Sequence, residues 1–306
     1  VLIGAGAGEP LALIEQLIEA VAALGPNANV RAVQVMTGGT ERITDITGRG
    51  LRVITPVPGK KTRKAIGEGT AELFTRPMSG LLRSLLDGTL PVDGILVQGR
   101  AIDDAHATFG LIADVMVPAW PAARWRAIEL NDRLPRIDAT EAITIAEAQV
   151  VAASSRDPNE LAPDPVSDAA RRIGEHVASI VPDGATFELG VGRSLAGIAD
   201  ALVAARRDLA MHTGIVGDVA MRLIEAGCVS RPMRGRAFAV GATAMGTRAY
   251  YAWADGESRI GLVDSRFAHS SDHLAMLPKF VSINGGLQVD LAGNMNANSH
   301  KGRIVS

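Results

Sequence analysis

The chain has 306 residues, 47% of them hydrophobic, and a formal net charge of −2 at pH 7. This length allows two domains with sizeable cores, whereas the charge gives no electrostatic footprint for nucleic acid. No uncharged apolar run reaches the roughly 18 residues of a membrane span, and the single Cys228 excludes an internal disulfide and a cysteine-built metal site. We therefore expect a cytoplasmic protein that binds neither nucleic acid nor membrane.

The chain opens with a strand that stops at glycines. Leu2 and Ile3 precede Gly4-Ala5-Gly6, and an amphipathic helical pattern follows. Residues 33–38 then give a second apolar strand that ends in Thr-Gly. Because a strand is already under way at Val1, we expect the natural protein to begin upstream.

The rest of the first half alternates between strand and helix patterns. We predict strands at 51–56 and 92–98, helices at 60–68 and 80–86, and a helix or loop at 120–125 that feeds a strand at 127–131. Residues 155–167 are polar and rich in proline, as in an interdomain linker. The predicted domains are therefore residues 1–160 and 161–306.

The opening pattern occurs again in the second half. After a helix capped by Ser167, a strand ends at Gly190-Val191-Gly192, a helix follows, and a short strand at 208–211 delivers His212-Thr213-Gly214 to a loop. Two copies of Gly-x-Gly, helix, strand and Thr-Gly predict two related α/β halves. A helix at 218–226 and strands at 237–240 and 280–284 complete the prediction.

The glycines at the strand end indicate where a ligand binds. Glycine allows close approach to the backbone and leaves amides free to face an anion, and open α/β sheets bind ligands at the carboxyl ends of their strands. Gly190-Val191-Gly192 lacks the third glycine of a dinucleotide-binding motif. We expect a site for a different ligand there.

Several segments, in this order, resemble the acetyl-CoA hydrolase/CoA-transferase family, especially its branch with 4-hydroxybutyrate CoA-transferase. They are Gly8-Glu9-Pro10, Leu189-Gly190-Val191-Gly192, His212-Thr213 with Asp218, and the segments 223–227, 245–247, 263–264 and 283–293. The resemblance implies a class I CoA-transferase-like fold of two similar open α/β domains with mainly parallel sheets. It also implies acyl-CoA as substrate with a small carboxylic acid as second substrate, no cofactor beyond coenzyme A, and a homodimer or higher homo-oligomer.

One position departs from the family pattern. Transferases of the family carry a glutamate directly after the His-Thr pair, and its carboxylate attacks the thioester to form an acyl anhydride and then a glutamyl-CoA thioester. Here that position is Gly214, which has no side chain. Either this protein does not perform ping-pong CoA transfer, or another carboxylate has replaced the missing one.

Glu188 is the candidate replacement, at a position where the family usually has glutamine. Neighbouring parallel strands lie about 5 Å apart, so residues 188 and 214 face one pocket if their strands are adjacent. The alternative is a solvated or salt-bridged strand-end residue. His212 is a candidate general base, with a positioning or purely structural histidine as the alternative.

The remaining candidates bind rather than react. The amides around Gly190 and Gly192 are suited to a thioester oxyanion or simply form a tight turn, and Asp218 caps or orients its loop. The other candidate substrate-binding residues are Thr213, Gly214, Met245, Gly246, Asn284 and Gln288. Two basic features, Arg193 and the run Lys60, Lys61, Arg63 and Lys64, are suited to ligand carboxylate or CoA phosphates, or reach solvent.

We expect no metal site at His269, Asp272 and His273, because these residues lack a fixed helical spacing. Residues 300–306 resemble a later family strand, so we expect a gap near 299–300 and an incomplete second domain. The expected function is acyl-CoA hydrolysis or a CoA-transferase-like reaction, with hydrolysis favoured. The alternative is a CoA-ester-binding non-catalytic homologue or a subunit of a hetero-oligomer.

Overall fold

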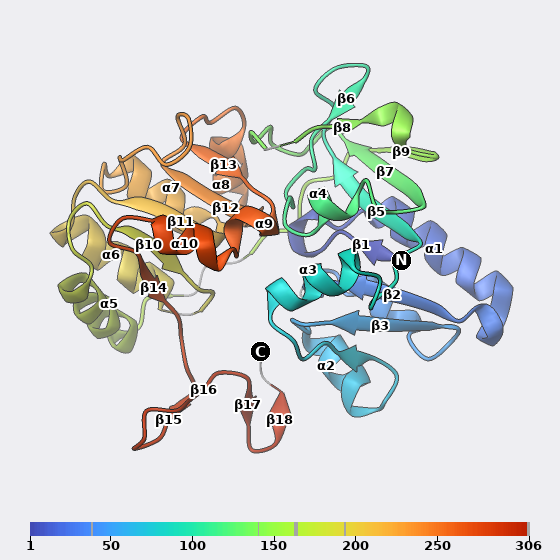
Figure 1. Cartoon of the computed structure of the whole chain (residues 1–306), viewed down its shortest axis with the longest axis horizontal. Helices are drawn as coiled ribbons and strands as arrows, with labels where there is room; N and C mark the ends of the chain where they lie inside the picture. Colours follow the sequence, from blue (N-terminus) through green and yellow to red (C-terminus); the bar gives the residue numbers. More distant parts are fainter. Residues whose placement is uncertain (38, 140, 162–164, 193, 305–306) are drawn as a thin grey trace. The chain divides into compact units, whose positions relative to one another are not determined.

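The computed structural model (Figure 1) describes residues 1–37, 39–139, 141–161, 165–192 and 194–304. It divides into two compact units, Val1–Leu134 with Glu141–Asn159 and Asn298–Ser306, and Pro135–Thr140 with Glu160–Ala297. Two segments therefore belong to the other unit than a single boundary at residue 160 predicts: Pro135–Thr140 lies in the second unit and Asn298–Ser306 in the first. Part of the predicted linker, 162–164, lies outside the described residues.

The first unit is built on a seven-stranded parallel sheet with the order β4-β3-β2-β1-β5-β7-β9. Its strands are β1 (Leu2–Ile3), β2 (Val30–Gln34), β3 (Leu51–Thr55), β4 (Glu72–Leu73), β5 (Gly94–Gly99), β7 (Trp125–Asn131) and β9 (Val150–Ser154). The helices are α1 (Leu11–Leu24), α2 (Lys60–Gly67), α3 (Met78–Leu86) and α4 (Met116–Ala119), and β6 (His106–Ala107) pairs with β8 (Ile143–Thr144). Short 3-10 helices lie at Gly6–Gly8, Gly25–Ala28, Arg42–Ile46 and Ile145–Glu147.

The second unit is built on a five-stranded parallel sheet with the order β13-β12-β11-β10-β14. Its strands are β10 (Thr186–Leu189), β11 (Ala210–Val216), β12 (Ala239–Ala244), β13 (Ile260–Leu262) and β14 (Val281–Ile283). The helices are α5 (Asp168–Ile180), α6 (Leu195–Ala205), α7 (Asp218–Glu225), α8 (Arg248–Ala254), α9 (Ser265–Ala268) and α10 (Ser271–Met276). The hairpin of β15 (Gln288–Val289) with β16 (Met295–Asn296) follows, and the hairpin of β17 (Ser299–His300) with β18 (Arg303–Ile304) belongs to the first unit.

The two sheets share one topology. Counted from β10, the second sheet has the order 4-3-2-1-5, and the first sheet, counted from β1, has the same order followed by two further strands, β7 and β9. The predicted fold class, two similar α/β halves with parallel sheets, is confirmed. None of the helices in the described parts of the chain has the length and hydrophobicity that a membrane span requires.

The Thr-Gly part of the predicted repeat is wrong. Ile3, directly before Gly4, pairs with Gln34. Phe187 pairs with Met211, so Leu189, directly before Gly190, comes level with Thr213 two residues further on. Gln34 rather than Thr37 is therefore the counterpart of Thr213. Gly38 lies outside the described residues.

Local signals at the helix starts were more reliable than those at the strand ends. Ser167 caps α5 as predicted, with its hydroxyl accepting from the Ala170 amide at 3.1 Å. The strand predicted at 208–211 was placed too early, because β11 continues to Val216. Its pairing with β12 continues to the Val216–Ala244 pair, so the His-Thr-Gly segment is strand and not loop.

Candidate active site

The candidate site lies at the topological switch point of the second unit. The order 4-3-2-1-5 reverses direction between β10 and β14, and such sheets bind ligands outside the carboxyl ends of the strands at this point. Glu188 on β10 pairs with Ser282 on β14, and it comes level with His212 on β11. Because residues level with one another on neighbouring strands point to the same face, these three side chains form one row.

The Glu188 carboxylate is held through a single oxygen. The Ser282 hydroxyl donates to Oε2, and Asn284 Nδ2 donates to the same Oε2 at 3.4 Å and to Ser282 Oγ at 3.0 Å. Within the described residues, Oε1 has no hydrogen-bond partner and Glu188 forms no ion pair. The salt-bridge alternative therefore finds no support among the described residues, and one carboxylate oxygen is left for a ligand.

Gly190 makes room for Asn284. A Cβ at residue 190 would lie 2.1 Å from Asn284 Oδ1, so a larger residue would displace the asparagine. The Gly190 amide donates to the Ile283 carbonyl at 2.9 Å, which corrects the expectation that this amide is free for an oxyanion. Nothing lies within 4 Å of a Cβ at Gly192. Arg193 lies outside the described residues.

His212 is fixed and buried, with 1% of its surface exposed. Its Nε2 lies 3.0 Å from the Ala268 carbonyl, which can only accept, so Nε2 carries the hydrogen. Nδ1 is buried and has no partner among the described residues. Burial lowers the pKa of His212, and the hydrogen bond to the Ala268 carbonyl raises it by a smaller amount. The imidazole is therefore neutral at pH 7.

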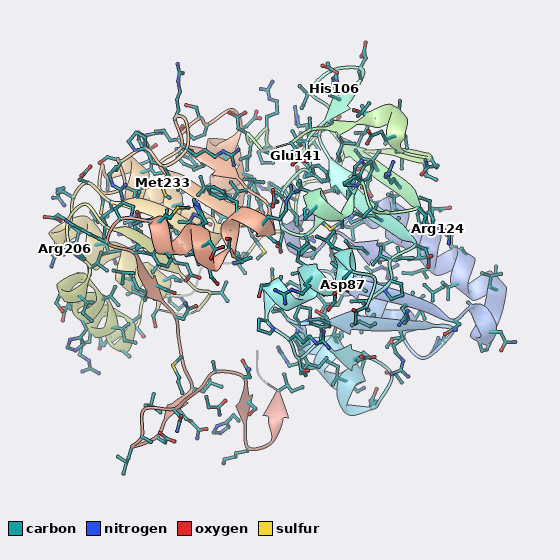
Figure 2. All side chains as sticks on the ribbon, viewed as in Figure 1. Asp87, His106, Arg124, Glu141, Arg206 and Met233 are labelled. Carbon is teal, nitrogen blue, oxygen red and sulfur yellow. The ribbon has the colours of Figure 1, made fainter. Side chains whose placement is uncertain are left out.

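His212 lies beside an apolar cluster and beside His273, with 5.3 Å between the centroids of the two imidazole rings. His212 pairs with Val240 on β12, and an apolar cluster there contains Ala237, Val240, Ala242, Val263 and Ala268, with Met233 and Phe267 packed against it. Figure 2 draws these side chains and labels Met233. Thr213 points to the opposite face of the sheet and donates to the Leu189 carbonyl at 2.9 Å.

Gly214 lies two residues beyond His212 on the same face, diagonally across from Glu188. The nearest atom to a Cβ placed there is His269 Cε1 at 3.8 Å, an ordinary van der Waals distance, and the residue does not have a positive φ. A Cβ at residue 214 would therefore meet no steric clash.

The other predicted residues are distributed more widely. The Met245 amide donates to the Val216 carbonyl at 3.0 Å, and Gly246 has no room for a Cβ beside the Asp218 carboxylate, 2.4 Å away. That carboxylate accepts from the Thr247 amide at 2.9 Å, so Asp218 orients this loop. These contacts support the carboxyl ends of β11 and β12.

Gln288 lies on an exposed hairpin, where its side-chain oxygen accepts from Asn296 at 2.9 Å. No hydrogen bond joins Gln288 to the Glu188 row among the described residues. In the basic run of α2, Lys61 pairs with Asp45 at 2.7 Å and Lys64 with Glu68 at 3.6 Å. The described parts of the chain contain no group of three or more potential metal-ligating side chains.

Comparisons with known proteins agree with this fold. The family model described as acetyl-CoA hydrolase/transferase C-terminal domain matches residues 246–306. A succinyl-CoA:acetate/propanoyl-CoA:succinate CoA transferase of Fasciola hepatica is 27% identical over 98% of this chain and 63% of its own length. A 4-hydroxybutyrate coenzyme A transferase of Clostridium kluyveri is 27% identical over 79% of this chain and 57% of its own length. The chain thus spans less than two thirds of these relatives.

Two solved structures share the fold. RipA from Yersinia pestis has a TM-score of 0.85 at 22% identity and covers 97% of this chain and 72% of its own. A 4-hydroxybutyrate CoA-transferase from Porphyromonas gingivalis has a TM-score of 0.74 at 21% identity and covers 96% of this chain and 71% of its own. The matching family model and the relatives with similar sequences show that this chain is similar to members of the acetyl-CoA hydrolase/CoA-transferase family.

Proposed function

We propose that this protein is an acyl-CoA-processing enzyme in which Glu188 attacks the thioester, with hydrolysis favoured over CoA transfer. The observation that carries the proposal is the position of Glu188 on the same face as Gly214, with Oε2 held by neutral donors and Oε1 unpaired among the described residues. The Glu188 carboxylate lies diagonally across from residue 214, the position that the family resemblance assigns to the nucleophilic glutamate.

The chemistry requires two steps. Glu188 Oε1 attacks the thioester carbonyl carbon, the carbon–sulfur bond breaks, and CoA leaves as the thiolate, which gives a mixed anhydride on Glu188. Water then opens the anhydride and releases the carboxylic acid. Water is always present, whereas CoA transfer needs a second bound acid, and for this reason we favour hydrolysis.

His212 serves in this proposal as a positioning residue. Its buried Nδ1 has no access to a substrate in this conformation, and its Nε2–H ties β11 to Ala268 at the end of α9. The neutral imidazole thereby keeps the floor of the site in place beside Glu188.

The substrates that we propose are taken from the names of the relatives with similar sequences. Their names include succinyl-CoA, propanoyl-CoA, acetate and 4-hydroxybutyrate, so we propose CoA esters of small carboxylic acids, with CoA as substrate and not as cofactor. A homo-oligomer in the cytoplasm is part of the same proposal, and light scattering of the purified protein tests the assembly.

The experiment measures free CoA with a thiol reagent, using acetyl-, propanoyl-, butyryl-, succinyl- and 4-hydroxybutyryl-CoA with and without acetate. We expect release without acetate, and a loss of at least about a thousandfold in Glu188→Gln, as for removal of other enzyme nucleophiles. Glu175→Gln, on the exposed surface of α5, is the matched control and should retain full activity.

Calorimetry with CoA and with each ester completes the test. We expect Glu188→Gln to bind CoA as tightly as the unmodified protein does. Tight binding of esters by the unmodified protein without any turnover would instead favour the non-catalytic homologue. Unchanged turnover in Glu188→Gln would exclude Glu188 as the nucleophile.

A further inference from the structure

Both hydrogen bonds to the Glu188 carboxylate converge on one oxygen. The Ser282 hydroxyl and Asn284 Nδ2 donate to Oε2, and Nδ2 also donates to Ser282 Oγ at 3.0 Å. Aligned chains of hydrogen bonds of this kind polarise one another. The arrangement therefore concentrates donor strength at Oε2, next to an Oε1 that has no partner among the described residues.

We propose that Ser282 and Asn284 form an oxyanion site for the carbonyl group that Glu188 acquires on acylation. The acylated enzyme is then opened by attack on Glu188 Cδ and not on the acyl carbonyl. This inference rests on the proposed function, because it requires that Glu188 is acylated.

In the anhydride, Oε1 joins the acyl group to Cδ, and Oε2 is the carbonyl oxygen. Water adds to Cδ, the π electrons move to Oε2, and the new negative charge lies beside the two donors. Collapse breaks the Cδ–Oε1 bond, so the acyl group leaves as a carboxylate that carries Oε1, and the protons of water pass to solvent. Glu188 returns as a carboxylate with one oxygen from water.

Gly190 gives the site its second donor. A Cβ at residue 190 would lie 2.1 Å from Asn284 Oδ1 and 3.0 Å from its Cγ. Alanine at this position therefore displaces the Asn284 amide but alters neither Glu188 nor Ser282. This makes Gly190→Ala a probe of the Asn284 donor that keeps every polar group of the row.

Turnover of acetyl-CoA in ¹⁸O-labelled water, followed by mass spectrometry of the peptide that contains Glu188, tests the inference. We expect ¹⁸O in the Glu188 side chain after several turnovers, none without acetyl-CoA, and none in the peptide that contains Glu175. Label in the released acetate alone would overturn the inference, since water would then have attacked the acyl carbonyl.

The rates provide a second readout. Ser282→Ala, Asn284→Ala and Gly190→Ala should each release about one CoA per enzyme rapidly and then turn over ~10- to 100-fold more slowly, less than for a fully buried oxyanion donor because Ser282 and Asn284 are exposed. Ser258→Ala, at an exposed loop serine, is the control. Equal slowing of the first CoA release and of turnover would assign these residues to the first attack and contradict the inference.

Glu188→Gln separates the two proposals. If Glu188→Gln retains turnover, the proposed function fails. If Glu188→Gln is inactive and Glu188 of the active protein remains unlabelled, the proposed function stands and only the oxyanion site is refuted.

Discussion

Gly214→Glu places a carboxylate at the position where transferases of the family carry their glutamate. The effect of this substitution on the free energy of unfolding can be worked out from the structure. The new Cβ meets only His269 Cε1 at 3.8 Å, and the backbone at Gly214 does not have a positive φ. Replacing glycine within a strand should stabilise the fold by roughly 0.5–1 kcal/mol. We therefore expect no steric loss of stability.

The cost is electrostatic. Residues 188 and 214 are one strand apart and two residues out of level, which gives about 8 Å between their Cα atoms. Two carboxylates at that separation repel by ~0.5 kcal/mol in water and ~2 kcal/mol at an effective dielectric constant of 20. The net change in the free energy of unfolding should lie between a loss of about 1.5 kcal/mol and a gain of about 0.5 kcal/mol.

Urea unfolding of Gly214→Glu and of the uncharged Gly214→Gln measures this balance. Gly214→Gln should be the more stable of the two by the repulsion term. In an exchange assay between acetyl-CoA and labelled propanoate, Gly214→Glu should gain transfer activity and Gly214→Gln should not. A loss of more than about 3 kcal/mol in both variants would refute the open space at residue 214.

Two further predictions concern stability. Because burial lowers the pKa of His212 below its ordinary value of 6.5, the unfolded chain binds the extra proton, so stability is full above pH 6.5 and falls as the pH drops below it. His212→Gln, which keeps a donor for the Ala268 carbonyl, should flatten this acid slope in urea titrations between pH 7 and 5, and an unchanged slope would contradict the assignment. Gly174→Ala should lower the free energy of unfolding by roughly 1–3 kcal/mol because its Cβ would lie 2.1 Å from the Gly197 carbonyl oxygen. Gly67→Ala, a helical glycine with nothing within 4 Å of a Cβ, should gain about 0.5–1 kcal/mol, and equal effects would argue against the close α5–α6 packing.

The sequence predicted the fold well because its strongest signals are local. Glycines at strand ends, the Ser167 cap and the apolar helix faces each depend on a few neighbouring residues, and together they gave two α/β halves. The length of β11 could not be predicted in this way. Its continuation to Val216 depends on pairing with β12, and such pairing is set by tertiary contacts.

The site was predicted in part for a similar reason. Glu188, Gly190 and Gly214 stood out because they depart from or match a pattern along the chain. Ser282 did not, since its role arises only from the register of β10 against β14. Asn284 was singled out as a ligand-binding candidate, whereas its contact with Glu188 depends on the space over Gly190. Once strand adjacency is known, parallel register alone would have indicated Ser282.

The central claim is that Glu188 carries the acyl group during turnover, and direct trapping tests it. The protein is mixed with acetyl-CoA, quenched with hydroxylamine and digested, and its peptides are analysed by mass spectrometry. We predict a hydroxamate on Glu188, absent from Glu188→Gln and from samples without acetyl-CoA. Release of CoA with no hydroxamate on Glu188, or with the hydroxamate on another residue, would contradict the claim.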